Sequence, residues 1–246
     1  MGNIVNYRDT DGDTTAYPSQ VIWADCPVFE IMTDPSRGIH FHDDFMNAPS
    51  AAAGASGTIG LSPGNGYVFY GDTGVVMKAQ PGATEGEGMA LEVSGNDADN
   101  DEGSLSTGAP AFLISDTGTY KSRKLWFEAR IKSATVADNG VSQFIGLAWD
   151  DDSGVPVAGA EALVDNTGAL GAFSFLGFHV DAADGDAWNF VYKAEGQSQV
   201  DHIAGVDVAV ADTYAKFGFI FDPAATADKR IRVYVDGVEN STYVTD

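Results

Sequence analysis

Short alternating runs, separated by clusters of Gly, Asp and Asn, dominate the chain from about residue 67 onward. In KLWFEARIK (124–132), four apolar side chains alternate with Trp126, Glu128, Arg130 and Lys132. A period of two places successive side chains on opposite faces of a strand. Many short strands with turn residues between them are typical of an antiparallel β-sandwich, so we predict an all-β fold.

The same pattern gives the positions of the individual strands. We predict strands at 66–70, 74–80, 89–94, 111–115, 124–132, 142–149, 172–180, 187–196, 214–222 and 230–237. Phe217, Phe219 and Phe221 share one face of their strand, which we expect to be a core face. Asp236-Gly237 is a strong hairpin signal, so the final strand should turn back there.

Residues 1–39 lack this periodicity, and we predict an N-terminal extended arm there, followed by one sandwich domain at 40–246. The arm carries Val21, Ile22, Trp23 and Phe29, which are not linker residues, so it should lie against another surface. The alternative is that the arm supplies an edge strand to its own domain. A Gly-, Ala- and Ser-rich stretch at 47–66 is expected to be flexible.

The charge of the chain excludes one class of partner. Against 13 Lys and Arg stand 36 Asp and Glu, a formal net charge of −23, so nucleic acid is not an expected partner. The acidic residues either keep the protein soluble or bind a shell of divalent cations at its surface. The single Cys26 cannot form an internal disulfide. The start of the chain lacks the basic and apolar regions of a signal peptide, and no apolar run approaches about 18 residues, so we expect neither a signal peptide nor a membrane span. We expect a soluble protein made in a cytoplasm.

The strand sequences resemble a known family. LWFEARIKS, FIGLAWDD, YAKFGFIFD and KRIRVYVDGVE together resemble the concanavalin A-like, laminin G-like jelly roll over roughly residues 39–240. With IHFHDDF before them, they are similar to structural proteins of tailed bacteriophages, including capsid decoration (cement) proteins. The resemblance implies a non-enzymatic virion protein on the capsid surface. Its partners would be the major capsid protein and copies of itself, in a homotrimer.

Glu128 is the candidate for a catalytic carboxylate in this fold. Retaining β-glucanases with this fold carry E-x-D-x-E or E-x-D-x-x-E on one strand, and no such stretch occurs here. Arg130 and Trp126 flank Glu128 on its own face, and Glu195 stands alone in its strand. We therefore predict no catalytic residue. Glu128 is expected to pair with cations across strands, and Trp126 to belong to a contact surface.

The alternative function is a carbohydrate-binding, lectin-like module of a phage tail or another surface protein. It would use exposed aromatic side chains that stack on sugar rings. The candidates are Trp126, Trp149, Trp188 and Tyr234. Each could instead be buried in the core or at a subunit contact.

Metal sites are supported only by acidic clusters, and no cofactor is predicted. Asp97, Asp99 and Asp101 have D-x-D-x-D spacing, which would suit a structural calcium ion in a loop. The cluster is not an EF-hand, because Glu102 occupies the sixth position, where an EF-hand needs Gly. HFHDDF (40–45) offers His40 and His42 but lacks the third histidine of a metallo-hydrolase motif.

Overall fold

The structure is a computed structural model of the 246-residue chain. It describes residues 18–34, 36–43, 51–52, 57–60, 67–71, 75–79, 89–93, 103–107, 112, 114, 123–133, 141–149, 163, 168–181 and 186–240. In these residues every strand pairing is antiparallel, and the helices are limited to one α-helix of six residues and one short 3-10 helix. The all-β prediction is confirmed.

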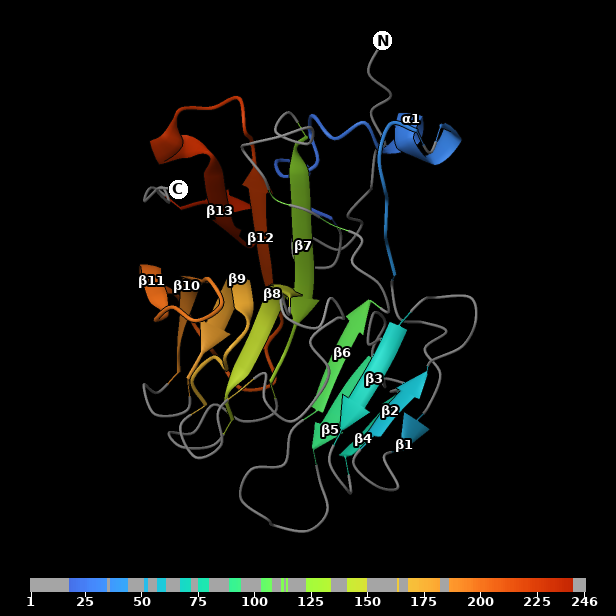
Figure 1. Ribbon diagram of the computed structural model, residues 1–246, viewed down its shortest axis with the longest axis vertical. Coiled ribbons are helices and arrows are strands. Elements are labelled where there is room, and N and C mark those ends of the chain that lie inside the picture. Colours follow the sequence, from blue (N-terminus) through green and yellow to red (C-terminus); the bar gives the residue numbers. More distant parts are fainter. Residues whose placement is uncertain are drawn as a thin grey trace.

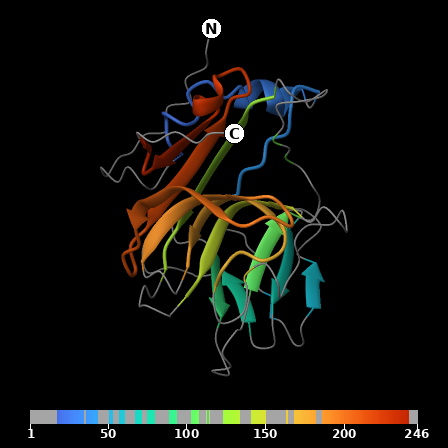
Figure 2. The ribbon, with the colours of Figure 1, turned by 60° about the vertical axis from the view of Figure 1, so that its left-hand side comes forward.

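Two four-stranded sheets form a sandwich (Figures 1 and 2). One sheet has the order β11-β10-β9-β8, with β8 at Gln143–Trp149, β9 at Ser174–Val180, β10 at Ala187–Lys193 and β11 at Val200–Val208. The other has the order β14-β13-β12-β7, with β7 at Leu125–Ile131, β12 at Ala215–Phe221, β13 at Ile231–Val235 and β14 at Val238–Glu239. The 3-10 helix Ala227–Lys229 precedes β13.

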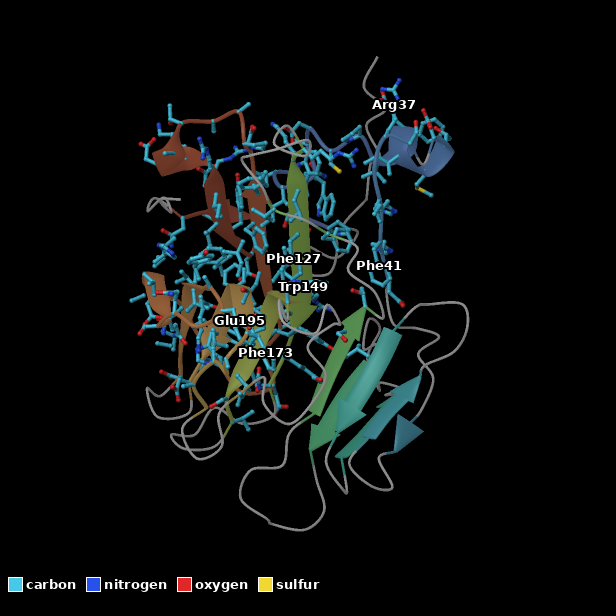
Figure 3. All side chains as sticks on the ribbon, in the orientation of Figure 1. Arg37, Phe41, Phe127, Trp149, Phe173 and Glu195 are labelled. Atoms are coloured by element: carbon cyan, nitrogen blue, oxygen red, sulfur yellow. The ribbon has the colours of Figure 1, made fainter. Side chains whose placement is uncertain are left out.

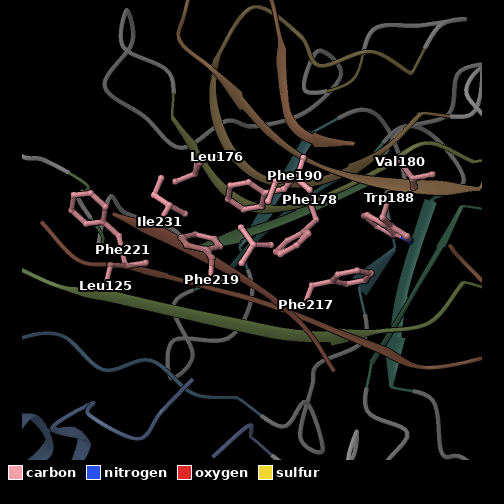
Figure 4. Packing of buried hydrophobic residues seen from close by; sticks show 12 residues of the cluster. Leu125, Leu176, Phe178, Val180, Trp188, Phe190, Phe217, Phe219, Phe221 and Ile231 are labelled. Carbon is pink, nitrogen blue, oxygen red and sulfur yellow. The ribbon is translucent and has the colours of Figure 1, made fainter. Parts of the chain in front are cut away.

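Aromatic side chains fill the space between the two sheets (Figure 4). The Phe217 ring of β12 lies 4.9 Å from the Phe178 ring of β9, and the Phe219 ring lies 5.7 Å from the Phe190 ring of β10. All four are fully buried. The core face predicted for β12 is therefore confirmed.

Six further strands form two three-stranded sheets at the lower right of Figure 1. One has the order β1-β4-β5, with β1 at Ala51–Ala52, β4 at Val75–Ala79 and β5 at Met89–Val93. The other has the order β2-β3-β6, with β2 at Gly57–Gly60, β3 at Tyr67–Gly71 and β6 at Gly103–Thr107.

Several strand predictions need correction. The stretch 47–66, expected to be flexible, contains β1 and β2. Phe112 and Ile114, the two described residues of the strand predicted at 111–115, are not in a strand, and β6 lies just before them. The nine-residue β11 was not predicted at all. It lies at the edge of its sheet and carries Asp and Gly, so its sequence lacks the buried alternation of an inner strand.

Residues 18–34 of the N-terminal segment fold locally into turns and a short helix. Residues 19–25 form turns, α1 spans Val28–Thr33, and the described part of 18–43 contains no strand. The backbone N–H of Trp23 donates to the Ser19 carbonyl (3.1 Å), and that of Ile31 donates to the Pro27 carbonyl (3.0 Å), so the hydrogen bonds of this stretch are local. The described part of the predicted arm therefore consists of turns, a short helix and irregular chain, and the rest of the arm lies outside the described residues.

Candidate functional site

The strongest candidate site is the outer face of the sheet β14-β13-β12-β7, opposite the aromatic core. Residues 18–26 lie over this face. Ile22 is 1% exposed and packs with Ile220 of β12 and Tyr234 of β13, while Trp23 and Trp126 border the cluster. The N-terminal segment therefore covers a sheet face, and no described part of it adds an edge strand.

The carboxylate of Glu128 is the polar anchor of this contact. It accepts hydrogen bonds from the Ser19 backbone N–H (3.1 and 2.9 Å), the Ser19 hydroxyl (2.5 Å) and the Trp23 indole N–H (2.5 Å). The Lys216 ammonium lies 3.6 Å from Oε1 of Glu128, and the two side chains are 3% and 6% exposed. A buried charge requires such partners, because its hydration is lost. Glu128 thus holds a peptide segment in place.

Glu128 and Glu195 are not placed as a pair of catalytic carboxylates. Glu128 points away from the core of the sandwich, whereas Glu195 (Figure 3) follows β10 in the opposite sheet. Two catalytic carboxyl groups would have to flank one glycosidic bond. Both carboxylate oxygen atoms of Glu128 accept hydrogen bonds from Ser19 and Trp23 of the same chain, so Glu128 binds residues 18–26.

A second anchor lies at the end of the segment. The Asp25 carboxylate accepts hydrogen bonds from the Lys124 ammonium (3.0 Å) and the Trp126 indole N–H (2.9 Å), and Lys124 also lies 2.6 Å from Asp222. Burial alone would raise the pKa of Asp25. The hydrogen bonds from Lys124 and Trp126, with the charges of Lys124 and Arg232, outweigh burial and lower that pKa below its ordinary value.

The predicted interaction residues fall into two groups. Ile22, Trp23 and Trp126 contact the chain's own sheet, or the segment that covers it. Val21 and Phe29 remain 56% and 61% exposed. Three further apolar side chains on the same N-terminal stretch are exposed and were not predicted, namely Met32, Ile39 and Phe41. Ser19, Lys216 and Gly218 were not predicted either, because each contacts residues that are distant in the sequence.

The aromatic residues proposed for sugar stacking are mostly buried or hydrogen-bonded within the chain. Trp188 and Tyr234 are 3% and 1% exposed, so neither can offer a ring face to a ligand. Trp126 is half-buried and donates its indole N–H to Asp25. Trp149 is half-buried at the end of β8 (Figure 3). These positions give the carbohydrate-binding alternative little support.

The calcium site predicted at Asp97, Asp99 and Asp101 stays a prediction. Asp97, Asp99 and Asp101 lie outside the described residues. His40 and His42 have parallel rings with centroids 6.4 Å apart, and burial, followed by the charge of His42, lowers the pKa of His40. Within the described part of the chain, no group of three or more His, Cys, Asp or Glu side chains could hold a metal ion.

Comparisons with protein-family models, with curated proteins and with solved structures give no match. The helices in the described ranges are too short or too polar to cross a bilayer.

Proposed function

We propose that this chain is a non-enzymatic structural protein of a tailed-bacteriophage virion, specifically a capsid decoration protein. In this proposal its sandwich is a concanavalin A-like jelly roll on the capsid surface. It is made in the host cytoplasm, docks on the major capsid protein and stabilises the head. Copies of the chain associate with one another in a homotrimer. The resemblance of the strand sequences to such proteins motivates the proposal.

The observation that carries the proposal is that Glu128 binds a segment of its own chain. The one carboxylate of β7 on this face binds residues 18–26, and it does so in a closed network with Ser19, Trp23 and Lys216. A face that resembles an enzyme platform therefore carries a fixed layer of protein. Such a layer suits a docking surface better than a substrate groove.

The outer side of the N-terminal stretch offers apolar side chains for docking. Val21, Phe29 and Met32 are 56%, 61% and 66% exposed, while Ile22 and Ile31 in the same stretch are buried. Exposed apolar groups in a locally ordered segment are typical of protein–protein contacts. A stable protein–protein contact buries about 1,000 Å² or more. These residues would form the apolar centre of such an interface.

The proposal is tested on capsids that lack this chain. Adding the purified chain should raise the temperature and the osmotic shock that the capsids withstand. Val21→Asp should weaken this protection, because it places a charge in the docking surface. Val208→Asp is the matched control, since Val208 is also 56% exposed but lies on β11 of the other sheet. Unchanged capsid stability with the wild-type chain would refute the cement role.

A further inference from the structure

Two of the chain's four histidines lie side by side in the N-terminal stretch. Residues 36–43 run as a straight trace below α1 (Figure 1). The His40 and His42 rings are 2° from parallel, and their centroids lie 6.4 Å apart. Two residues of an extended chain advance about 6.6 Å, so this separation places both imidazoles on the same side of the stretch. Ile39 and Phe41, which alternate with them, are exposed.

The ring nitrogen atoms of this pair are open to a ligand. His42 is exposed and His40 is half-buried. Within the described ranges, neither imidazole takes part in a hydrogen bond or an ion pair. The two other histidines differ, because Nε2 of the buried His179 lies 2.9 Å from a backbone carbonyl oxygen and the His202 ring lies against that of Tyr192. In the described part of the chain, this pair alone brings two imidazoles together.

Two neighbouring imidazoles are suitable ligands for one class of ion. Neutral imidazole is the commonest protein ligand of metals, and it suits zinc, nickel and copper. Calcium and magnesium prefer oxygen ligands, so they would bind carboxylates of the chain instead. The formal charge of −23 raises the concentration of any divalent cation near the surface. The charge therefore attracts divalent ions in general, and the two imidazoles select transition metals among them.

We propose that His40 and His42 together bind one divalent transition-metal ion, such as Zn²⁺. Each ring supplies one nitrogen atom at about 2.0 Å, and on one tetrahedral ion the two ring centres would lie about 5 Å apart. The rings therefore have to approach each other by roughly 1 Å, which rotation of the exposed His42 side chain provides. The described residues form no group of three or more possible ligands, so water fills the remaining positions.

A site with two protein ligands is weaker than a closed structural zinc site, which has four. It is still stronger than a single histidine, because the second nitrogen atom is already close when the first one binds. We expect a Kd for Zn²⁺ on the order of 10 µM. Metal binding here goes beyond the proposed capsid role and is independent of it, because the two side chains would bind the ion in the isolated chain.

Isothermal titration calorimetry on the purified full-length chain tests the site. Zn²⁺ is added at about pH 7.5, where ordinary imidazoles are neutral, with an excess of Ca²⁺ present to compete for carboxylates. Wild type should bind one Zn²⁺ ion. His40→Ala and His42→Ala should each raise the Kd by roughly tenfold or more, because one imidazole remains. His202→Ala is the matched control: it removes a half-buried imidazole whose ring lies against Tyr192, and it should change the Kd less than about twofold.

Electron paramagnetic resonance of the Cu²⁺-loaded chain counts the bound imidazoles. The spectrum should show nitrogen coupling from two rings in wild type and from one ring in either single variant. Unchanged thermal unfolding of each metal-free variant shows that the fold is intact. Three results would overturn the proposal. They are no Zn²⁺ binding in the presence of Ca²⁺, equal affinity of wild type, His40→Ala and His42→Ala, and a loss of affinity in His202→Ala as large as in His42→Ala.

Discussion

Ile22 fills the space in which Gly218 lacks a side chain. A Cβ atom built at residue 218 would lie 2.5 Å from Cδ1 of Ile22 and 2.9 Å from the backbone oxygen of Phe127. Gly218 pairs with Glu128 in the register between β12 and β7. The glycine therefore lets the N-terminal segment approach the sheet directly above its polar anchor.

The Ile22–Gly218 contact predicts a coupled pair of substitutions. Gly218→Ala should destabilise the chain by about 1–3 kcal/mol through overpacking, and Ile22→Ala by about 2–5 kcal/mol through loss of buried side chain. In the Ile22→Ala background, Gly218→Ala should cost less, because the first clash is gone and only that with the Phe127 oxygen remains. Urea unfolding of the four chains measures the coupling. Strictly additive costs would show that Ile22 does not occupy this space.

The Glu128–Lys216 pair predicts a large effect of removing one buried charge. Glu128→Ala should lower the free energy of unfolding by about 3–5 kcal/mol, because it removes one member of a buried ion pair and the acceptor of the Ser19 and Trp23 hydrogen bonds. Glu30→Ala is the control: Glu30 is 62% exposed and pairs with Arg37, so its loss should cost less than about 1 kcal/mol. The double variant Glu128→Gln/Lys216→Met should be more stable than Lys216→Met alone. Equal effects of Glu128→Ala and Glu30→Ala would contradict the buried network.

The lowered pKa of Asp25 predicts that its contribution to stability depends on pH. Its pKa is lowered in the folded chain, so its contribution is complete above the ordinary value of 3.8 and is lost as the pH falls through the lowered folded value. The carboxylate is largely solvent-accessible, so the contribution should be below about 1 kcal/mol. Thermal unfolding should show wild type above Asp25→Asn at neutral pH, with the difference shrinking below about pH 4. A difference that grows on acidification would contradict the assigned partners.

Cys26 reports whether the segment is docked. Burial, and then the charge of Asp25, raise the pKa of its thiol from 9.0 to about 11. Because the thiolate is the reactive form, Cys26 should react with a disulfide reagent at pH 8 roughly a hundredfold more slowly than an ordinary cysteine. Glu128→Ala should speed the reaction by releasing residues 18–26. An equal rate in both chains would mean that Glu128 does not hold the segment.

The sequence predicted the sandwich core more readily than the covered face. Phe217, Phe219 and Phe221 alternate within seven residues, so a local pattern was enough to identify their core face. Ser19 and Glu128 are 109 positions apart, and no periodicity links them. One signal was available: Ile220 lies on the predicted outer face of its strand, and an apolar side chain there indicates that something covers it. The short α1 spans too few residues for helical periodicity to show.

The most direct measurement for the account as a whole is the number of copies of this chain per purified phage particle. It can be counted by quantitative mass spectrometry against the major capsid protein. A decoration protein that binds the capsid lattice should be present in hundreds of copies, and Val21→Asp should reduce that number while Val208→Asp leaves it unchanged. A handful of copies would place the chain in the tail, and its absence from purified particles would contradict the virion role altogether.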